Sequence, residues 1–127
     1  MRKKTVAQRS IFDQALDTLT ALVKPDRELK RIDAVITQNP NIIDLVHQDL
    51  TSGVANATGA NGMSSEQVLR IAIVRQLKQY SWRELAQRLN DGIWLRWFCR
   101  LYTGKVSHYT ALQKVVKAIS EETWAAI

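Results

Sequence analysis

Side chains suited to binding DNA gather near the C-terminal end of the sequence, in a predicted helix over 107–119. Thr110, Gln113, Lys114 and Lys117 recur at helical spacing and fall within one narrow arc, whereas the opposite arc is apolar. Hydroxyls and amides hydrogen-bond to base edges, and lysines bind phosphates. Because this arc carries no acidic residue, it has the composition that a recognition helix needs.

The start of the same helix adds two polar residues. Ser107 is the predicted N-cap, and the first backbone N–H groups of a helix lack intrahelical partners and bind anions. His108 suits a contact with phosphate or a base as well as it suits an ordinary surface position beside a cap. We expect both residues to lie in the same interface as the polar arc.

Arginines earlier in the chain extend the candidate DNA-binding set. Arg83 lies in a predicted helix over 81–91, which is typical of the supporting helix of a helix-turn-helix. Arg96 and Arg100 share one face of a predicted helix over 93–101, the alternative reading helix. We prefer 107–119, because 93–101 also holds two indoles and a phenylalanine. Indoles stack on bases, but apolar positions favour a core role for most of the four: Trp82, Trp94, Trp97 and Trp124.

Catalytic and metal-binding chemistry has few candidates. Cys99 is the only cysteine, which excludes a disulfide framework, and a buried, inert thiol is favoured over a nucleophile. Asp44 and His47 have a spacing that suits a metal, but a solvated helix face is favoured. The carboxylates after residue 70 are dispersed, whereas two-metal phosphoryl transfer needs carboxylates that converge on both ions. The sequence predicts no catalytic residue, metal, cofactor or small-molecule substrate.

Helices must position these groups, because apolar residues recur at helical spacing along most of the chain. The chain has 127 residues, enough for one domain, and only 5 glycines and 2 prolines, which argues against a turn-rich β fold. Ser64 and Gln67 form a predicted capping box. The helix that follows is apolar almost all round, which predicts a central, buried position.

The expected fold is all-α, a compact multi-helix domain containing a helix-turn-helix-like unit. Its expected parts are a basic flexible tail over 1–9, a single helical domain over 10–127, and within that domain an acidic half over 10–50, a loop over 51–62 and a basic half over 63–120. The tail suits a DNA-contacting arm as well as a plain disordered terminus.

Charge is distributed unevenly along the chain. The net charge is +6, with ten bases and two acids over residues 70–117 but four bases and eight acids over residues 10–69. A local basic surplus is typical of proteins that bind nucleic acid. No apolar run approaches the roughly 18 residues of a membrane span, and no signal peptide is evident. We therefore expect a cytoplasmic protein without a membrane partner.

Residues 62–119 resemble the N-terminal domain of bacterial insertion-sequence transposases whose catalytic domain carries two aspartates and a glutamate. The resemblance is carried by the order and spacing of three blocks, SWREL at 81–85, LRWFCRL at 95–101 and SHYTALQ at 107–113. It implies a helical module that binds double-stranded DNA at the ends of the element.

The resemblance also implies that DNA cutting and joining belong to a separate Mg²⁺-dependent domain, which this sequence does not contain. We therefore expect no strand-transfer activity from this chain, which would be a fragment or a truncated reading frame. Transposases act on paired DNA ends, so the resemblance implies a homodimer. The competing hypothesis is a protein–protein interaction or dimerisation module with a regulatory role.

Overall fold

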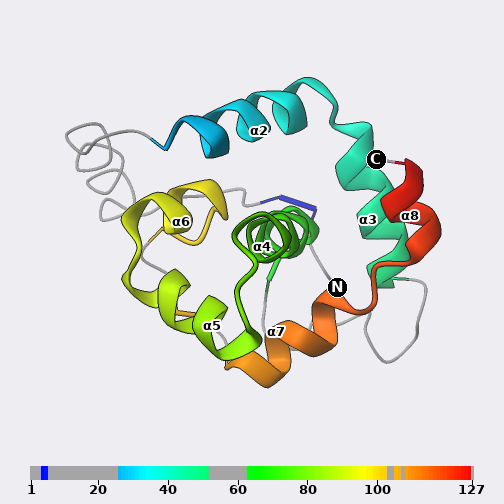
Figure 1. Cartoon of the computed structure of the whole chain (residues 1–127). Coiled ribbons are helices and arrows are strands. Elements are labelled where there is room, and N and C mark those ends of the chain that lie inside the picture. The colour runs from blue at the N-terminus through cyan, green and yellow to red at the C-terminus, as the bar shows by residue number, and fades with distance from the viewer. Residues whose placement is uncertain (1–3, 6–25, 52–62, 103–104, 107, 127) are drawn as a thin grey trace.

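The computed structural model describes residues 4–5, 26–51, 63–102, 105–106 and 108–126. All regular elements within these ranges are α-helices, arranged around a central helix (Figure 1). The predicted all-α class is confirmed. The predicted first helix after Ser10 lies outside the described residues, as do residues 52–62 of the predicted loop. The helices are α2 (Arg27–Gln38), α3 (Asn41–Thr51), α4 (Ser65–Lys78), α5 (Trp82–Asp91), α6 (Ile93–Phe98), α7 (Tyr109–Val116) and α8 (Glu121–Ala126).

The central helix is α4, as its all-round apolar sequence predicts. The Ser64 hydroxyl accepts a 3.2 Å hydrogen bond from Gln67 N–H, and the Gln67 side chain accepts a 2.8 Å bond from Ser64 N–H. This capping box gives hydrogen-bond acceptors to two backbone N–H groups at the start of the helix, those of Ser64 and Gln67. The apolar residues that follow are almost fully buried, and they are Val68, Leu69, Ile71, Ala72 and Val74.

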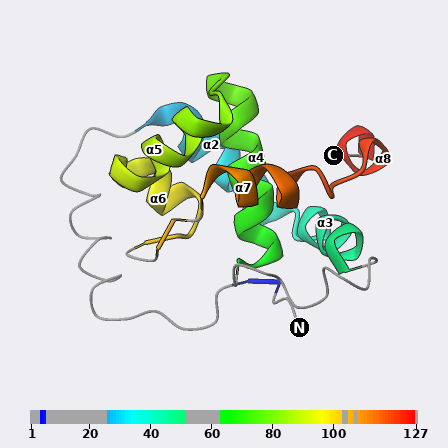
Figure 2. The same cartoon turned by 90° about the horizontal axis from the view of Figure 1, so that it is seen from below.

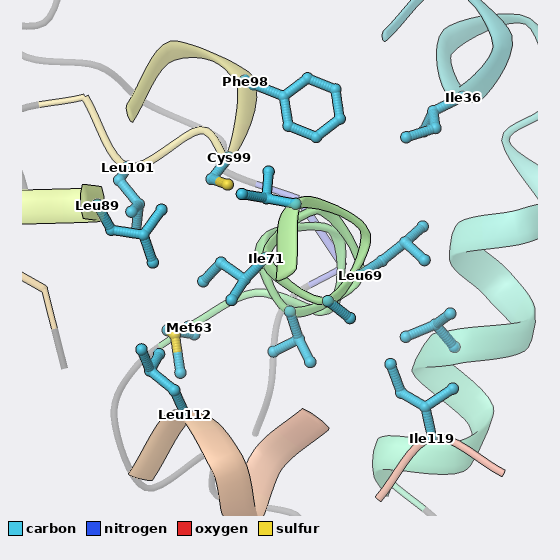
Figure 3. Close-up of a cluster of buried hydrophobic side chains, with 14 of the residues drawn as sticks. Ile36, Met63, Leu69, Ile71, Leu89, Phe98, Cys99, Leu101, Leu112 and Ile119 are labelled. Carbon is cyan, nitrogen blue, oxygen red and sulfur yellow. The ribbon is translucent and has the colours of Figure 1, made fainter. Parts of the chain in front are cut away.

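Side chains from the surrounding helices complete the core around α4. Figure 3 looks along the axis of α4 and shows Ile36 of α2, Leu89 of α5, Phe98 of α6 and Leu112 of α7 around it. Each is at most 2% exposed. Burial of side chains of this size from several helices drives the folding of an α-helical domain.

A cluster of charges around one buried arginine, the ionic junction, joins α2 and the segment that follows α6 to α4; it consists of Asp33, Glu66, Arg70 and Arg100. The Arg70 side chain is fully buried, and its guanidinium lies 2.7 Å from the Asp33 carboxylate and 3.0 Å from the Glu66 carboxylate. It also donates to the Phe98 carbonyl. Arg100 approaches the same Asp33 oxygen at 2.7 Å. Asp33 therefore neutralises two bases that lie far from it in the sequence.

A second contact between the acidic and basic halves lies at the start of α2. The Asp26 carboxylate caps α2 by accepting from Leu29 N–H, and it pairs with the Lys78 ammonium at 3.2 Å. Burial raises the pKa of Asp26, but these hydrogen bonds and the Lys78 charge outweigh it, so the pKa lies below its ordinary value. Residues 26–50, the described part of the acidic half, pack against the basic half through contacts of α2 with α6 and of α3 with α4.

Two of the predicted helices are shorter in the structure. The predicted helix over 93–101 ends at Phe98, and Arg100 and Tyr102 adopt left-handed backbone conformations with φ of 59° and 52°. The predicted helix over 107–119 ends at Val116. Its final residues instead form a turn, since Ala118 and Ile119 N–H donate to carbonyls only three residues back.

Helix α8 is a C-terminal element that the sequence analysis did not predict. Asp49 of α3 accepts hydrogen bonds from Ser120 N–H, the Ser120 hydroxyl and the Thr123 hydroxyl. The Ser120 hydroxyl accepts in turn from Thr123 N–H, as an N-cap does. These bonds hold α8 beside α3, as both views show (Figures 1 and 2).

Part of the predicted basic tail contacts the helices. The Lys4 carbonyl accepts from Glu66 N–H, one of the first amides of α4, and the Lys4 ammonium lies 2.9 Å from the Asp44 carboxylate. Thr5 is also described. The other residues of the tail lie outside the described part of the chain.

Candidate nucleic-acid interface

Helix α7 is held to the rest of the protein by its apolar side. Leu112 is 1% exposed, and Val115 and Val116 are half-buried against the core. Figure 2 shows α7 in front of α4, with no other described helix covering it from that side. The amphipathic pattern thus sets the orientation of α7, because its apolar arc must face α4.

The opposite side of α7 remains open. Thr110, Lys114 and Lys117 are exposed and Gln113 is half-buried. Lys114 and Lys117 form no ion pair with any residue that the structure describes. No acidic residue occurs between Asp91 and Glu121 in the sequence. The predicted polar arc therefore presents cations and hydrogen-bonding groups without an adjacent carboxylate on its own helix.

The N-terminal end of α7 is capped by His108, one residue later than predicted. His108 Nδ1 accepts from Thr110 N–H at 3.3 Å and lies 2.9 Å from the Thr110 hydroxyl. The imidazole is exposed. Ser107, the predicted N-cap, lies outside the described residues. His108 thus organises the start of the helix while its ring stays accessible.

Arg83 joins this end of α7 from the neighbouring helix α5. Its guanidinium donates to the Tyr109 hydroxyl at 3.2 Å and lies 5.0 Å from the centre of the Tyr109 ring. The Tyr109 ring lies 4.4 Å from the His108 ring, centre to centre. Tyr109 was not among the predicted site residues. An aromatic residue two positions after the predicted cap was the available signal, but its partner on α5 emerges only in the fold.

Arg96 and Arg100 do not join this surface. Arg96 donates to the backbone carbonyls of Asn90 and Tyr102, and so ties the two ends of the α6 segment together. Arg100 pairs with Asp33 in the ionic junction and donates to the Trp97 carbonyl. The sequence predicted that both arginines share an outward face of the helix. In the structure both guanidinium groups instead bind carbonyl or carboxylate groups of the same chain.

Two of the helices expected to form a helix-turn-helix do pack together, but not through a short turn. Helices α5 and α7 are in contact. Helix α6 lies between them in the sequence, and Gly92 alone separates α5 from α6. Helix α5 therefore contacts α7 as a supporting helix would, but α6 lies between the two in the chain. In a helix-turn-helix the two helices are joined directly by a turn of three or four residues.

The remaining candidates are accounted for by internal contacts. Cys99 is fully buried, and burial raises the pKa of its thiol far above the usual range despite the nearby Arg70 and Arg100 charges. His47 hydrogen-bonds the Ser65 hydroxyl through Nδ1 at 2.7 Å, and Asp44 pairs with Lys4. The described ranges hold no group of three or more potential metal ligands.

Comparisons with known proteins point to one family. The family model described as transposase domain (DUF772) matches residues 17–118, which is well over half of the chain. No curated protein and no solved structure shows a significant match. None of the helices in the described ranges is long and apolar enough to cross a membrane.

Proposed function

This chain belongs to the transposase domain (DUF772) family, and from that premise we propose that it binds double-stranded DNA at insertion-sequence ends. The binding surface is the α7 face, which comprises Thr110, Gln113, Lys114 and Lys117 with His108 and Arg83 at its N-terminal end. The observation that carries the proposal is the polar side of α7, which carries no acidic residue and lies opposite the side that packs on the core.

The dimensions of α7 suit the major groove. With its side chains, an α-helix such as α7 is about 10–12 Å in diameter. B-form DNA has a major groove about 12 Å wide, which admits an α-helix. In this arrangement Lys114, Lys117 and Arg83 bind phosphates. Thr110 and Gln113 supply a hydroxyl and an amide to base edges, and His108 reaches a phosphate or base at the entrance.

The proposed role is recognition and not strand chemistry. The chain would act in the bacterial cytoplasm, where its DNA lies, without cutting or joining strands by itself. A homodimer would bring two DNA ends together, and light scattering of the purified protein with and without DNA tests that part of the proposal.

The central experiment measures DNA binding by fluorescence anisotropy over a salt series. The probes are duplexes from the flanks of the protein's own gene, with scrambled duplexes for comparison. The test variant is K114E/K117E, and the matched control is R27E/R31E. Arg27 and Arg31 are exposed on α2, so the control changes the net charge equally at a distant place.

We expect K114E/K117E to lower the affinity at least about 100-fold, because two phosphate contacts become repulsive. The control should change it by less than about threefold. Equal losses in both variants would mean that net charge alone governs binding and that α7 is not the reading helix. Absence of binding at low salt by the unaltered protein would contradict the DNA proposal and favour the protein-interaction role.

A further inference from the structure

A groove opens at the C-terminal end of α7, where this helix meets α4, α8 and the start of α5. Its volume is about 630 Å³, within the range of about 300–1,000 Å³ that is typical of ligand sites. Trp82 and Trp124 lie on its walls. Lys117 belongs both to this groove and to the α7 face, so the groove continues the proposed DNA-binding surface.

The aromatic lining of the groove is accessible. Trp124 is 37% exposed, although a tryptophan in a small domain is usually largely buried. Trp82 is half-buried, and the Arg75 guanidinium carbon lies 4.0 Å from the centre of its ring. Indole rings of this kind stack on nucleobases without regard to sequence, since every base has a flat π-face.

The polar lining suits a nucleotide. Gln76 is exposed and carries an amide with both donor and acceptor groups. Glu121 supplies a carboxylate, which accepts hydrogen bonds from exocyclic amino groups of bases. Lys117 and Arg75 supply two cations against this one acid. Arg75 Nε is buried, and the described residues offer it no hydrogen-bond partner.

We propose that this groove binds an unpaired nucleobase of the DNA, stacked on Trp124, while Lys117 contacts the adjacent phosphate. The inference rests on the proposed function, because α7 brings the DNA to the groove. An apolar peptide is a poorer occupant, since the cations outnumber the acid and a groove adjoining the α7 face complements a polyanion. A base at a frayed or single-stranded end enters most readily, because no pairing has to be broken.

The experiment compares two DNA probes on the full chain. Both share one duplex sequence, and one of them ends in a short single-stranded overhang containing 2-aminopurine. Anisotropy gives the affinity, and 2-aminopurine fluorescence reports stacking on an aromatic ring. The variants are W124A, which removes the ring, and W124F, which retains one; urea unfolding verifies that both remain folded.

We expect the unaltered protein to bind the overhang probe about tenfold more tightly than the blunt probe and to quench its fluorescence. W124A should lose both the preference and the quenching, whereas W124F should keep most of each. All three proteins should bind the blunt duplex equally.

Equal affinity for the two probes without quenching would overturn the inference and leave the proposed function intact. A preference that persists in W124A would also overturn it, because the base would then bind elsewhere. Failure to bind either probe would contradict the proposed function itself. Normal binding of the blunt duplex without a preference for the overhang would contradict only the inference about the groove.

Discussion

The ionic junction and the α7 face are both built around basic side chains, but they treat positive charge in opposite ways. In the ionic junction, the fully buried Arg70 lies within 3.0 Å of two carboxylates. On the α7 face, Lys114 and Lys117 are exposed and unpaired among the described residues. A buried cation requires a partner because desolvation penalises an isolated charge, whereas an exposed lysine is solvated by water.

The difference shows how far a count of charges overstates a binding surface. Residues 70–117 hold ten bases and two acids, yet several of these bases are neutralised by acids from elsewhere in the chain. Arg70 and Arg100 pair with Asp33, and Lys78 pairs with Asp26. Fewer cations are therefore left without an acidic partner than the sequence suggests, and Lys114 and Lys117 are among them.

The largest expected effect comes from breaking the ionic junction. R70M should lower the free energy of unfolding by about 3–5 kcal/mol, because it leaves the Asp33 and Glu66 carboxylates without their buried partner. Urea denaturation measures this loss. The matched control K114M should change stability by less than about 0.5 kcal/mol. Similar values for the two variants would show that the two regions do not differ in this way.

Asp49 sharpens the comparison, because here a carboxylate is held by hydroxyl groups. Burial by itself would raise the pKa of Asp49. The hydrogen bonds from Thr123 and Ser120 lower it by a larger amount, so the pKa lies below its ordinary value. Such a group stabilises the fold fully above its unfolded pKa of about 3.9. That contribution is lost as the pH falls through the lower, folded pKa.

We expect D49N to lower the free energy of unfolding at pH 7 by about 1.5 kcal/mol. It should also flatten the decline in stability below about pH 4. Urea unfolding over a pH series measures both effects, and hydrogen exchange of the α8 amides reports the local loosening. An acid limb unchanged by D49N would show that Asp49 does not contribute to it.

A smaller effect, on the salt dependence of DNA affinity, should distinguish basic residues without an ion pair from basic residues paired with acids of the same chain. K114Q should reduce the slope of log affinity against log salt by about 0.9, the value for one phosphate contact on duplex DNA. R100Q should leave that slope unchanged at a temperature where the variant is folded, because Arg100 is paired with Asp33. A reduced slope in R100Q would place Arg100 on the DNA after all.

The smallest effect is expected for an exposed ion pair on α5. Arg88 lies 3.8 Å from Glu84, and the two side chains are 59% and 45% exposed. R88M should change the free energy of unfolding by less than about 0.5 kcal/mol, because water screens the pair. A loss comparable with that of R70M, measured by the same urea titration, would mean that burial does not determine how much an ion pair contributes to the free energy of unfolding.

Local patterns predicted the helices best where caps and periodicity agree. The predicted Ser64 cap forms, and the apolar sequence after it yields the central helix; Ser81 likewise caps α5. Prediction failed at the C-terminal ends of two helices. Continued helical spacing of apolar residues past Phe98 and Val116 did not reveal the left-handed residues or the turn that follow them. Apolar residues that reach the core from a turn look the same in sequence as residues in a helix.

The sequence by itself determined the all-α class, the central position of α4 and the polar arc of α7, because each depends on spacing within one segment. Only the tertiary structure decided which bases remain free, since Asp33 lies 37 residues from Arg70 and 67 from Arg100. It also decided that Arg83 meets Tyr109 and that α8 docks on Asp49. Such pairings depend on how helices pack, and no local period in the sequence records them.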